Sequence, residues 1–305
     1  MNNQQLNKDY CANANLISTT DRSSLITHAN QDFCDIAGYS TDELVGNPHN
    51  MVRHGDMPKQ AFEQMWTYLK QGKSWMGLVK NQCKDEAHYW VSAFVTPIKN
   101  PEGDIVEYQS VRSKPDSGQV ERAEALYHRL QQNKPTTKPR LPLHKLTLGS
   151  STLLALLSLL MLGTTPSVLS AAITLVAAMM TFVLAYQYRR NKSMAALAQQ
   201  AYSNPLMEKP YTNHFDDYSQ VELALKMKQA ELRAVTARAT ETSGEILISA
   251  EDEFGTIQSI GQSLDQQCHE TEQVAAAVEQ LTHSINEVAS GASAASMLAE
   301  EADQE

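Results

Sequence analysis

An uncharged stretch over residues 146–188 constrains this 305-residue chain more than any other feature. Its two halves, Leu146–Gly163 and Ser167–Tyr188, would form helices of about 27 and 33 Å at about 1.5 Å per residue. Each length matches the roughly 30 Å of a bilayer hydrocarbon core. A long buried helix of a soluble protein is the alternative, but Pro166 in the intervening Thr164–Pro166 turn would break it. The sequence therefore predicts a two-span transmembrane helical hairpin.

Basic residues flank both ends of this stretch. They are Lys138, Arg140 and Lys145 before it and Arg189, Arg190 and Lys192 after it. Because cytoplasmic flanks are enriched in Lys and Arg, both termini are expected in the cytoplasm. The turn on the other side has only a few residues, too few to bind an external ligand. We therefore expect any sensing to occur inside the cell, within residues 1–133.

The composition excludes several classes of protein. The chain carries 25 basic and 35 acidic residues, a net charge of −10, so it lacks the basic surplus that nucleic-acid binding needs. Its four cysteines form no CxxC pair, which argues against a disulfide framework and a structural zinc site. No glycine-rich nucleotide-binding loop occurs. We expect a protein without catalytic or metal-binding residues.

The C-terminal part has the pattern of an α-helical coiled coil. From Ile257 to Ala295, twelve positions follow alternating spacings of three and four, and ten of them are apolar. This is an a/d seam sustained over more than three heptads. Small seam residues predict a loosely packed bundle that shifts easily. Residues 239–305 carry fourteen acidic residues and no Lys or Arg, which marks a solvated face or a surface that recruits a partner.

Between the predicted membrane segment and this rod, the sequence predicts a helix, a break and a second helix. The break covers residues 202–220 and contains Pro205 and Pro210. A helix–connector–helix directly after a membrane span resembles a HAMP signal-relay module, mainly by its position.

The N-terminal part alternates between strand-like and helix-like segments. Two strands surround the turn Asp21–Ser23, and two short helices follow, with Asn30 and Thr41 as N-cap candidates. A longer helix begins near Pro58 and ends at Gly72, and three strand-like segments complete the domain. This order predicts an α+β domain, a five-stranded antiparallel sheet with helices on one face.

The order and the residues resemble the PAS domain of bacterial aerotaxis receptors. The resemblance is carried by ITHAN at 26–30, AGYS at 37–40, NMVRHGDMP at 50–58 and HYWV at 88–91. The segment TEQVAAAVEQLTHSINEVA at 271–289 is similar to the coiled coil of methyl-accepting chemotaxis receptors. The implied layout is a PAS sensor domain (14–116), a cytoplasmic linker (117–145), a transmembrane hairpin (146–188), a HAMP-like relay (189–240) and an incomplete N-terminal arm of the coiled coil (241–305).

The resemblance implies a redox sensor of the bacterial inner membrane that holds FAD. The cofactor-contacting positions carried over by motif are Asn30, Arg53, His54, Asp56, Phe62, Trp75 and Asn81. Their chemistry supports several of them. Arg53 can grip a pyrophosphate bidentately, Trp75 can stack on a ring, and the Asn81 amide can donate or accept as a flavin is protonated. Trp66 is expected to be a core aromatic.

Other readings of the N-terminal domain stay open. Haem is the alternative cofactor, with His28, His49, His54 and His88 as available axial ligands. A light sensor is excluded, because the Asn-Cys-Arg-Phe-Leu-Gln run of light-sensing flavin domains is missing. A small-ligand PAS regulator, a membrane-bound enzyme and a PAS oligomer with an empty pocket are further alternatives.

The implied partners are those of a chemotaxis receptor. They are a second copy or a higher oligomer, the membrane, and a chemotaxis histidine kinase with its coupling adaptor. In that family the kinase-binding tip and the returning helix follow the arm that ends here, so we expect a C-terminally truncated chain that modulates full-length partners or is a fragment. Glu272–Gln273 and Glu279–Gln280 are similar to methylation pairs but are also typical of solvated helices.

Overall fold

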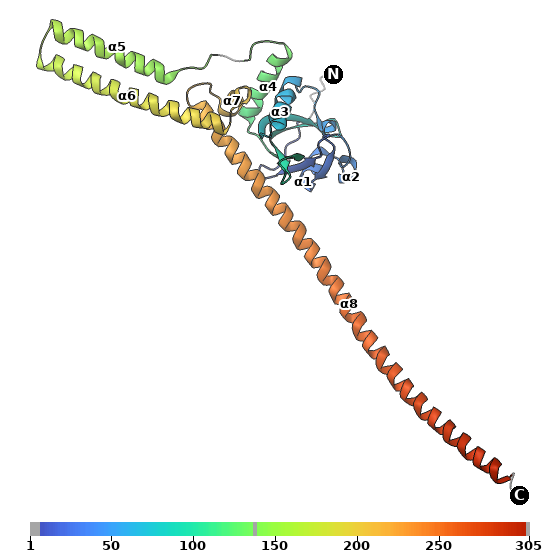
Figure 1. Ribbon diagram of the computed structural model, residues 1–305. Coiled ribbons are helices and arrows are strands. Elements are labelled where there is room, and N and C mark those ends of the chain that lie inside the picture. Colours follow the sequence, from blue (N-terminus) through green and yellow to red (C-terminus); the bar gives the residue numbers. More distant parts are fainter. Residues whose placement is uncertain (1–6, 137–138, 303–305) are drawn as a thin grey trace. The chain divides into compact units, whose positions relative to one another are not determined.

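The computed structural model describes residues 7–136 and 139–302. The chain divides into two compact units, Met1–Arg238 and Ala239–Glu305, and each is described by itself (Figure 1). Lys138, one of the predicted flanking cations, lies outside the described residues.

The first unit contains a five-stranded antiparallel sheet, as the sequence predicts. Its strands are β1 (Leu16–Thr20), β2 (Ile26–Ala29), β3 (Trp75–Gln82), β4 (His88–Lys99) and β5 (Ile105–Ser113). They lie in the order β2-β1-β5-β4-β3. This order brings the N-terminal strand between β2 and β5, so the sheet depends on pairing between residues nearly a hundred positions apart, such as Leu16 with Arg112.

Four short helical elements connect β2 to β3. They are α1 (Gln31–Ala37), α2 (Thr41–Leu44), the 3₁₀ helix η1 (His49–Val52) and α3 (Lys59–Lys70). Asn30 caps α1, as predicted, by accepting from the Phe33 N–H. The prediction for α2 is wrong by one residue. Ser40 is its N-cap, because only there can the side chain form a capping box with Glu43 three residues later.

The register gives the sheet two distinct faces. Trp75, Asn81 and Arg112 alternate onto an inner face, which α3 and η1 border. Met76 and Leu78 alternate onto the opposite, outer face. The outer face is also covered, by α4 (Ser117–Gln131) and α7 (Pro205–Thr212), in segments that the sequence analysis treats as a linker and a break. The sequence analysis expects helices on one face of the predicted domain, and the second cover comes from helices that lie beyond the predicted end of that domain at residue 116.

Tyrosine side chains tie α4 and the segment before α7 to the outer face. The hydroxyl of Tyr127 on α4 donates to the Leu78 carbonyl, and its ring stacks with Trp90 at 6.2 Å. The hydroxyl of Tyr202 donates to the Met76 carbonyl at 3.1 Å and accepts from the Met76 N–H at 3.0 Å. Each of these hydroxyls therefore finds a partner on β3 itself.

The α7 helix adds a further polar contact and an apolar anchor. The hydroxyl of Tyr211 lies 2.7 Å from the Ser92 hydroxyl of β4. Met207 is fully buried. This part of the predicted relay is thus packed into the same core as the sheet.

Two apolar helices form a hairpin. They are α5 (Leu143–Thr164) and α6 (Val168–Ala201), each long and apolar enough to cross a membrane. Hydroxyls link them, with Ser151 Oγ 2.9 Å from Thr181 Oγ1. The α6 helix continues well past Tyr188, where the predicted span ends. The uncharged span and the first relay helix are therefore one continuous helix.

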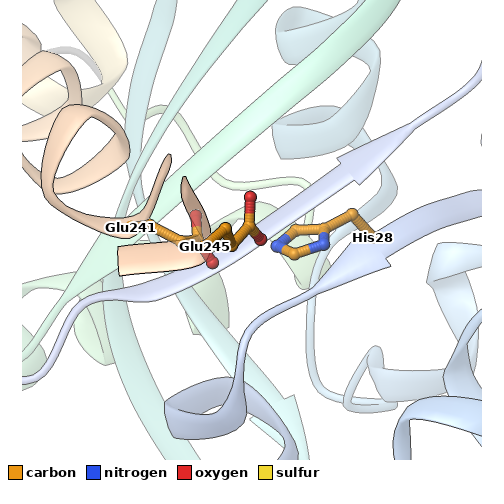
Figure 2. A group of neighbouring side chains, drawn as sticks. All are labelled: His28, Glu241 and Glu245. Atoms are coloured by element: carbon orange, nitrogen blue, oxygen red, sulfur yellow. The ribbon is translucent and has the colours of Figure 1, made fainter. Parts of the chain in front are cut away.

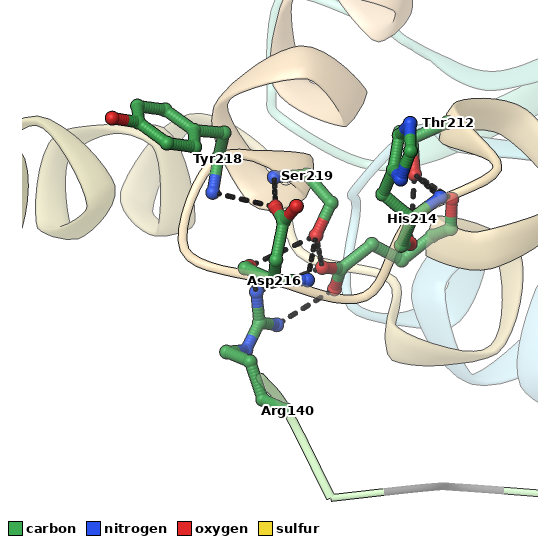
Figure 3. A network of polar contacts seen from close by, with 7 residues as sticks. Arg140, Thr212, His214, Asp216, Tyr218 and Ser219 are labelled. Carbon is green, nitrogen blue, oxygen red and sulfur yellow. Dashed lines mark hydrogen bonds and ion pairs between the residues drawn. The ribbon is translucent and has the colours of Figure 1, made fainter. Parts of the chain in front are cut away.

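A buried carboxylate joins the approach to α5 with the connector after α7. Glu208 is 2% exposed, lies 2.8 Å from the Arg140 guanidinium, and accepts from the Ser219 hydroxyl at 2.5 Å. Arg140 also donates to the Asp216 carbonyl at 2.5 Å (Figure 3). Opposite charges within hydrogen-bonding distance make this buried carboxylate tolerable. We call Arg140, Glu208, Asp216 and Ser219 the membrane-proximal cluster.

The last helix, α8, runs from Ser219 to Ala302 and continues from the first unit into the second. In the second unit every side chain from Glu245 to Ala299 is exposed. Figure 2 draws three side chains: Glu241 and Glu245, which lie four residues apart on α8, and His28, which belongs to β2 of the first unit. The predicted coiled-coil seam is therefore helical and exposed in the single chain, and its partner stays a prediction.

Candidate cofactor-binding cavity

A cavity of about 400 Å³ lies between the inner face of the sheet and the α3–η1 side of the domain. Its volume is within the range of small-molecule and cofactor sites. Aromatic side chains from both sides line it, namely Phe62, Trp66, Trp75 and Tyr108. Two arginines, Arg53 and Arg112, also line it, and within the described part of the chain no Asp or Glu does. This lining favours a ligand with flat rings and negative charge.

Arg53 lies directly after η1, at the edge of the cavity. Its backbone forms a bridge with Asn81 of β3, which fixes the end of η1 against the sheet. Its Nη2 donates to the Met57 carbonyl at 3.2 Å, and its Cζ lies 4.0 Å from the centre of the Phe62 ring. A guanidinium held over an aromatic ring keeps further N–H groups for an anionic ligand.

Trp75 forms part of the cavity wall at the start of β3. It is 1% exposed, and its Nε1 donates to the Gln64 side chain at 3.2 Å. The indole lies across Gly77, where a Cβ atom would be 2.1 Å from the ring. Any larger residue at position 77 would displace the indole. A glycine is therefore required for this ring to lie against its own strand.

Two polar atoms on the cavity wall are buried without a partner among the described residues. They are Asn81 Nδ2 and Ser110 Oγ, on residues that are 3% and 8% exposed. Buried polar groups are normally hydrogen-bonded, and an unmade bond costs about 1–3 kcal/mol. A ligand with hydrogen-bonding atoms in the cavity would remove this cost. The residues present therefore fit a ring system with polar edges, such as a flavin.

Arg112 and His49 form the second polar part of the wall. The guanidinium of Arg112 lies 2.6 Å from His49 Nε2 and donates to Ser18 Oγ at 3.0 Å. Burial lowers the pKa of Arg112 to about 10, so it stays charged at pH 7. Burial, and then the adjacent Arg112, lower the pKa of His49 to about 3. Counted over all its atoms, His49 is partly exposed. Its imidazole ring is enclosed, because it stacks on the ring of Phe33.

The structure brings four of the seven predicted positions to the cavity, Arg53, Phe62, Trp75 and Asn81. The other three have structural contacts elsewhere. The Asn30 side chain caps α1, accepts from the Ile17 N–H at 2.9 Å and donates to the Asn15 carbonyl at 2.7 Å, so its oxygen and its nitrogen both have partners within the domain.

His54 and Asp56 lie beside Lys80, on the other side of β3 from the cavity. His54 is 4% exposed and its Nδ1 accepts from the Asp56 N–H at 3.1 Å. Asp56 forms an ion pair with Lys80 at 2.7 Å, and the Lys80 hydrogen bond lowers the pKa of this carboxyl. In this arrangement both residues hold the loop after η1 in place.

Sequence reasoning missed Arg112 and Ser110, considered His49 only as a possible haem ligand, and expected Trp66 to be a plain core residue. Trp66 is only partly buried, lines the cavity and packs edge-on against Tyr108 with ring centres 5.3 Å apart. A signal existed on β5, where Tyr108, Ser110 and Arg112 alternate onto one face. Polar residues on the inward face of a strand indicate a cavity or a ligand.

Of the four histidines considered as haem ligands, His49 is the one that lines the cavity. Its Nε2 is already engaged by Arg112. A charged guanidinium against that nitrogen competes with an iron ligand. The cavity therefore fits a flavin better than a haem.

Comparison with known proteins agrees with this fold. A family model described as PAS fold matches residues 26–112. The aerotaxis receptor of Escherichia coli (strain K12) is 47% identical over 126 residues, which are 41% of this chain and 25% of that receptor. A nitrogen fixation regulatory protein of Klebsiella pneumoniae is 33% identical over 96 residues, 32% of this chain and 19% of the relative.

These similarities concern the PAS region. The matched part spans about a quarter or less of the length of these curated relatives, which are by name a receptor and a regulatory protein. A solved light-oxygen-voltage domain studied with a flavin analogue covers 39% of this chain and 88% of that chain, at 22% identity and a TM-score of 0.33. The family match and the five-stranded sheet identify residues 26–112 as a PAS domain, and this region of the chain is similar in sequence to an aerotaxis receptor.

Proposed function

We propose that this chain is a membrane-anchored redox sensor for aerotaxis that holds FAD in the PAS cavity. The observation that carries the proposal is the cavity itself. It has about 400 Å³, an aromatic wall, two arginines, no described carboxylate and two unpartnered polar atoms. The similarity to an aerotaxis receptor supports the role in aerotaxis, and FAD is the cofactor that the resemblance of the sequence motifs implies.

Residues of the cavity have distinct roles in this proposal. Arg53 would hold the pyrophosphate, because its guanidinium is fixed at the edge of the cavity by Phe62 and Met57. Trp75 and Asn81 would bind the ring, one by stacking and one by a hydrogen bond that reverses on protonation. The bound flavin supplies reversible uptake of electrons, and the surrounding residues report its state.

The outer face of the sheet would carry the signal to the helices. Strand β3 places Asn81 at the cavity and offers the Met76 and Leu78 carbonyls to Tyr202 and Tyr127. A shift of β3 that changes the fit around the ring therefore changes the contacts of α4 and of the segment before α7. A ligand biases such an equilibrium only through different interaction energies in the two states.

The remaining organisation follows from charge and hydropathy. We place α5 and the apolar part of α6 across the bacterial inner membrane, with both chain ends in the cytoplasm. The segment 189–240 would act as a HAMP-like relay and 241–305 as an arm of a chemotaxis-type coiled coil. A second copy or higher oligomer, a chemotaxis histidine kinase and its coupling adaptor would be the partners.

An absorption spectrum of the full chain in mild detergent tests the cofactor. We expect flavin bands that bleach on reduction with dithionite, and FAD as the compound released on denaturation. A Soret band would overturn the flavin in favour of haem. A colourless protein that takes up no added FAD would overturn the sensor proposal.

Reporter fusions test the topology separately. A reporter after Glu305 and one before Leu16 should both be cytoplasmic, whereas one inserted in the turn between α5 and α6 should be periplasmic. A periplasmic signal from either end would overturn the membrane arrangement without touching the cofactor proposal.

A further inference from the structure

Arg112 is the one fully enclosed cation of the cavity wall among the residues described. It is 3% exposed, whereas Arg53 at the edge is partly exposed. Its guanidinium contacts the Leu16 carbonyl at 3.4 Å, Ser18 Oγ and His49 Nε2. These are neutral groups, so they solvate the charge without cancelling it.

The other groups around Arg112 are also neutral at pH 7. The titratable side chains that act on it are those of Tyr10 and Tyr89, and burial raises the pKa of both hydroxyls well above the usual value. His49 is uncharged because its pKa is lowered to about 3. Its ring neighbour Phe33 lies 4.8 Å from Arg112 Cζ and carries no charge.

A buried charge without a counter-charge is costly. The effective penalty of burying an ion is several kcal/mol, and an opposite charge in the same site offsets it. The described lining of the cavity supplies no carboxylate, so the opposite charge has to come from the ligand. Arg53 adds a second positive charge to the wall and so increases the preference of the cavity for a negatively charged ligand.

We propose that Arg112 makes the cavity favour a reduced flavin that carries negative charge and so raises the reduction potential of the bound cofactor. This rests on the proposed function. The oxidised ring is neutral. Two electrons and one proton give a reduced anion, and a second proton gives the neutral reduced ring. A nearby fixed cation stabilises the anion, but not the oxidised or the neutral reduced ring.

Arg53 and Arg112 therefore differ in their expected effect. A residue that holds the pyrophosphate binds a charge that is the same in both redox states. Its loss weakens binding of both states equally and leaves the potential nearly unchanged. A residue that holds charge appearing only on reduction changes the ratio of the two affinities, which is the potential.

The experiment compares three variants of the full chain in detergent, loaded with FAD. Arg112→Gln removes the charge and keeps a polar group, and Arg112→Lys restores the charge. Lys80→Gln is the matched control, because it removes a cation from the neighbouring strand position to Asn81 but on the opposite face. Potentials are measured by titration with dithionite against a reference dye at pH 7.

We expect Arg112→Gln to favour the oxidised form about tenfold or more, since a nearby opposite charge shifts a titration by about one to three units. For a two-electron couple this is a potential lower by about 30 mV or more. Arg112→Lys should recover most of the shift, and Lys80→Gln should match the original chain. A flavin-loaded Arg112→Gln protein with an unchanged potential would overturn the inference and leave the proposed function standing.

A second measurement needs no variant and covers the case in which Arg112→Gln fails to bind flavin. In the original chain the potential should change by about 30 mV per pH unit between pH 5.5 and 6.5, as for one proton per two electrons. A slope of about 60 mV per pH unit would mean that the reduced ring takes up both protons, and would overturn the inference. A chain that binds no flavin at all would overturn the proposed function and the inference together.

Discussion

The two faces of the PAS sheet differ in what covers them. On the inner face, polar atoms such as Asn81 Nδ2 and Ser110 Oγ are buried without a partner among the described residues, and a cavity separates the strands from α3. On the outer face, helices pack directly on the strands, and the hydroxyls of Tyr127, Tyr202 and Tyr211 each meet a group of the sheet. His88 Nδ1 and Gln109 Nε2 on this face are also without a partner among the described residues, but neither lines the inner-face cavity. Unpartnered polar atoms beside a cavity are suited to a ligand, whereas strands covered directly by helices are suited to permanent packing.

One strand can serve both a ligand and permanent packing because its side chains alternate between the two faces. Strand β3 presents Trp75 and Asn81 inward, while the backbone of Met76 and Leu78 is held by tyrosines outside. A single strand, β3, therefore separates the cavity from the helices that would carry the signal. The following predictions test whether the two faces respond separately to substitution, as this division requires.

The largest effect is expected from Trp75→Ala on the inner face. It removes a fully buried indole from the cavity wall, so flavin content should fall at least tenfold and the free energy of unfolding by about 3–5 kcal/mol. Flavin absorbance per protein and urea unfolding in detergent measure the two. Tyr127→Phe is the control and should keep its flavin. Unchanged flavin content in Trp75→Ala would remove this residue from the site.

The corresponding change on the outer face is Met207→Ala. Because Met207 is fully buried under the sheet, we expect a loss of about 2–5 kcal/mol in the free energy of unfolding. Flavin content of the folded fraction should stay at the original level, since Met207 does not line the cavity. Loss of flavin without loss of stability would contradict the separation of the two faces.

A pH dependence of stability should come from the inner face. The pKa of His49 is lowered to about 3 in the folded chain by burial and by Arg112, against 6.5 for the ordinary group. The unfolded chain therefore binds a proton that the folded chain does not, and stability falls as pH drops below 6.5. We expect His49 to contribute about 1 kcal/mol per pH unit between pH 6.5 and 5.5. His49→Gln should reduce the slope by that amount, and an identical slope would show that His49 is freely protonated.

The smallest effect is expected from Tyr211→Phe. It removes one hydroxyl contact with Ser92 and keeps the ring in place, so the loss should be about 1 kcal/mol. A double-mutant cycle with Ser92→Ala isolates the pair. Strictly additive losses would mean that the two hydroxyls do not interact.

Much of the sheet could be predicted from the sequence because alternation and turns are local signals. The five strands, the α1 cap at Asn30 and the helix that ends near Gly72 all follow from short windows. The cavity was predicted only in part. Arg53 and Trp75 stand in a recognisable run, but Arg112 joins them through pairing of β5 with β1 and β4, which no local pattern specifies.

The second cover of the sheet was missed for a similar reason. In the segment treated as a linker, Val120, Ala123 and Tyr127 follow the spacing of one helix face and pack into the core. This pattern indicates a buried face but does not name its partner. The partner is the outer surface of strands far earlier in the chain, joined by α7 from far later. Such contacts depend on tertiary packing rather than on periodicity.

The contacts beside the membrane-proximal cluster, at the two ends of the apolar hairpin, decide how the first unit is connected. The Leu141 N–H donates to the Phe215 carbonyl at 3.0 Å, and His144 Nδ1 lies 3.4 Å from Asn191 Nδ2 of α6. The segment that enters the apolar hairpin and the segment that leaves it therefore lie side by side. The hairpin is therefore an insertion, and replacing it with a short bridge between the neighbourhoods of His144 and Asn191 would leave the rest of the fold connected in its original order.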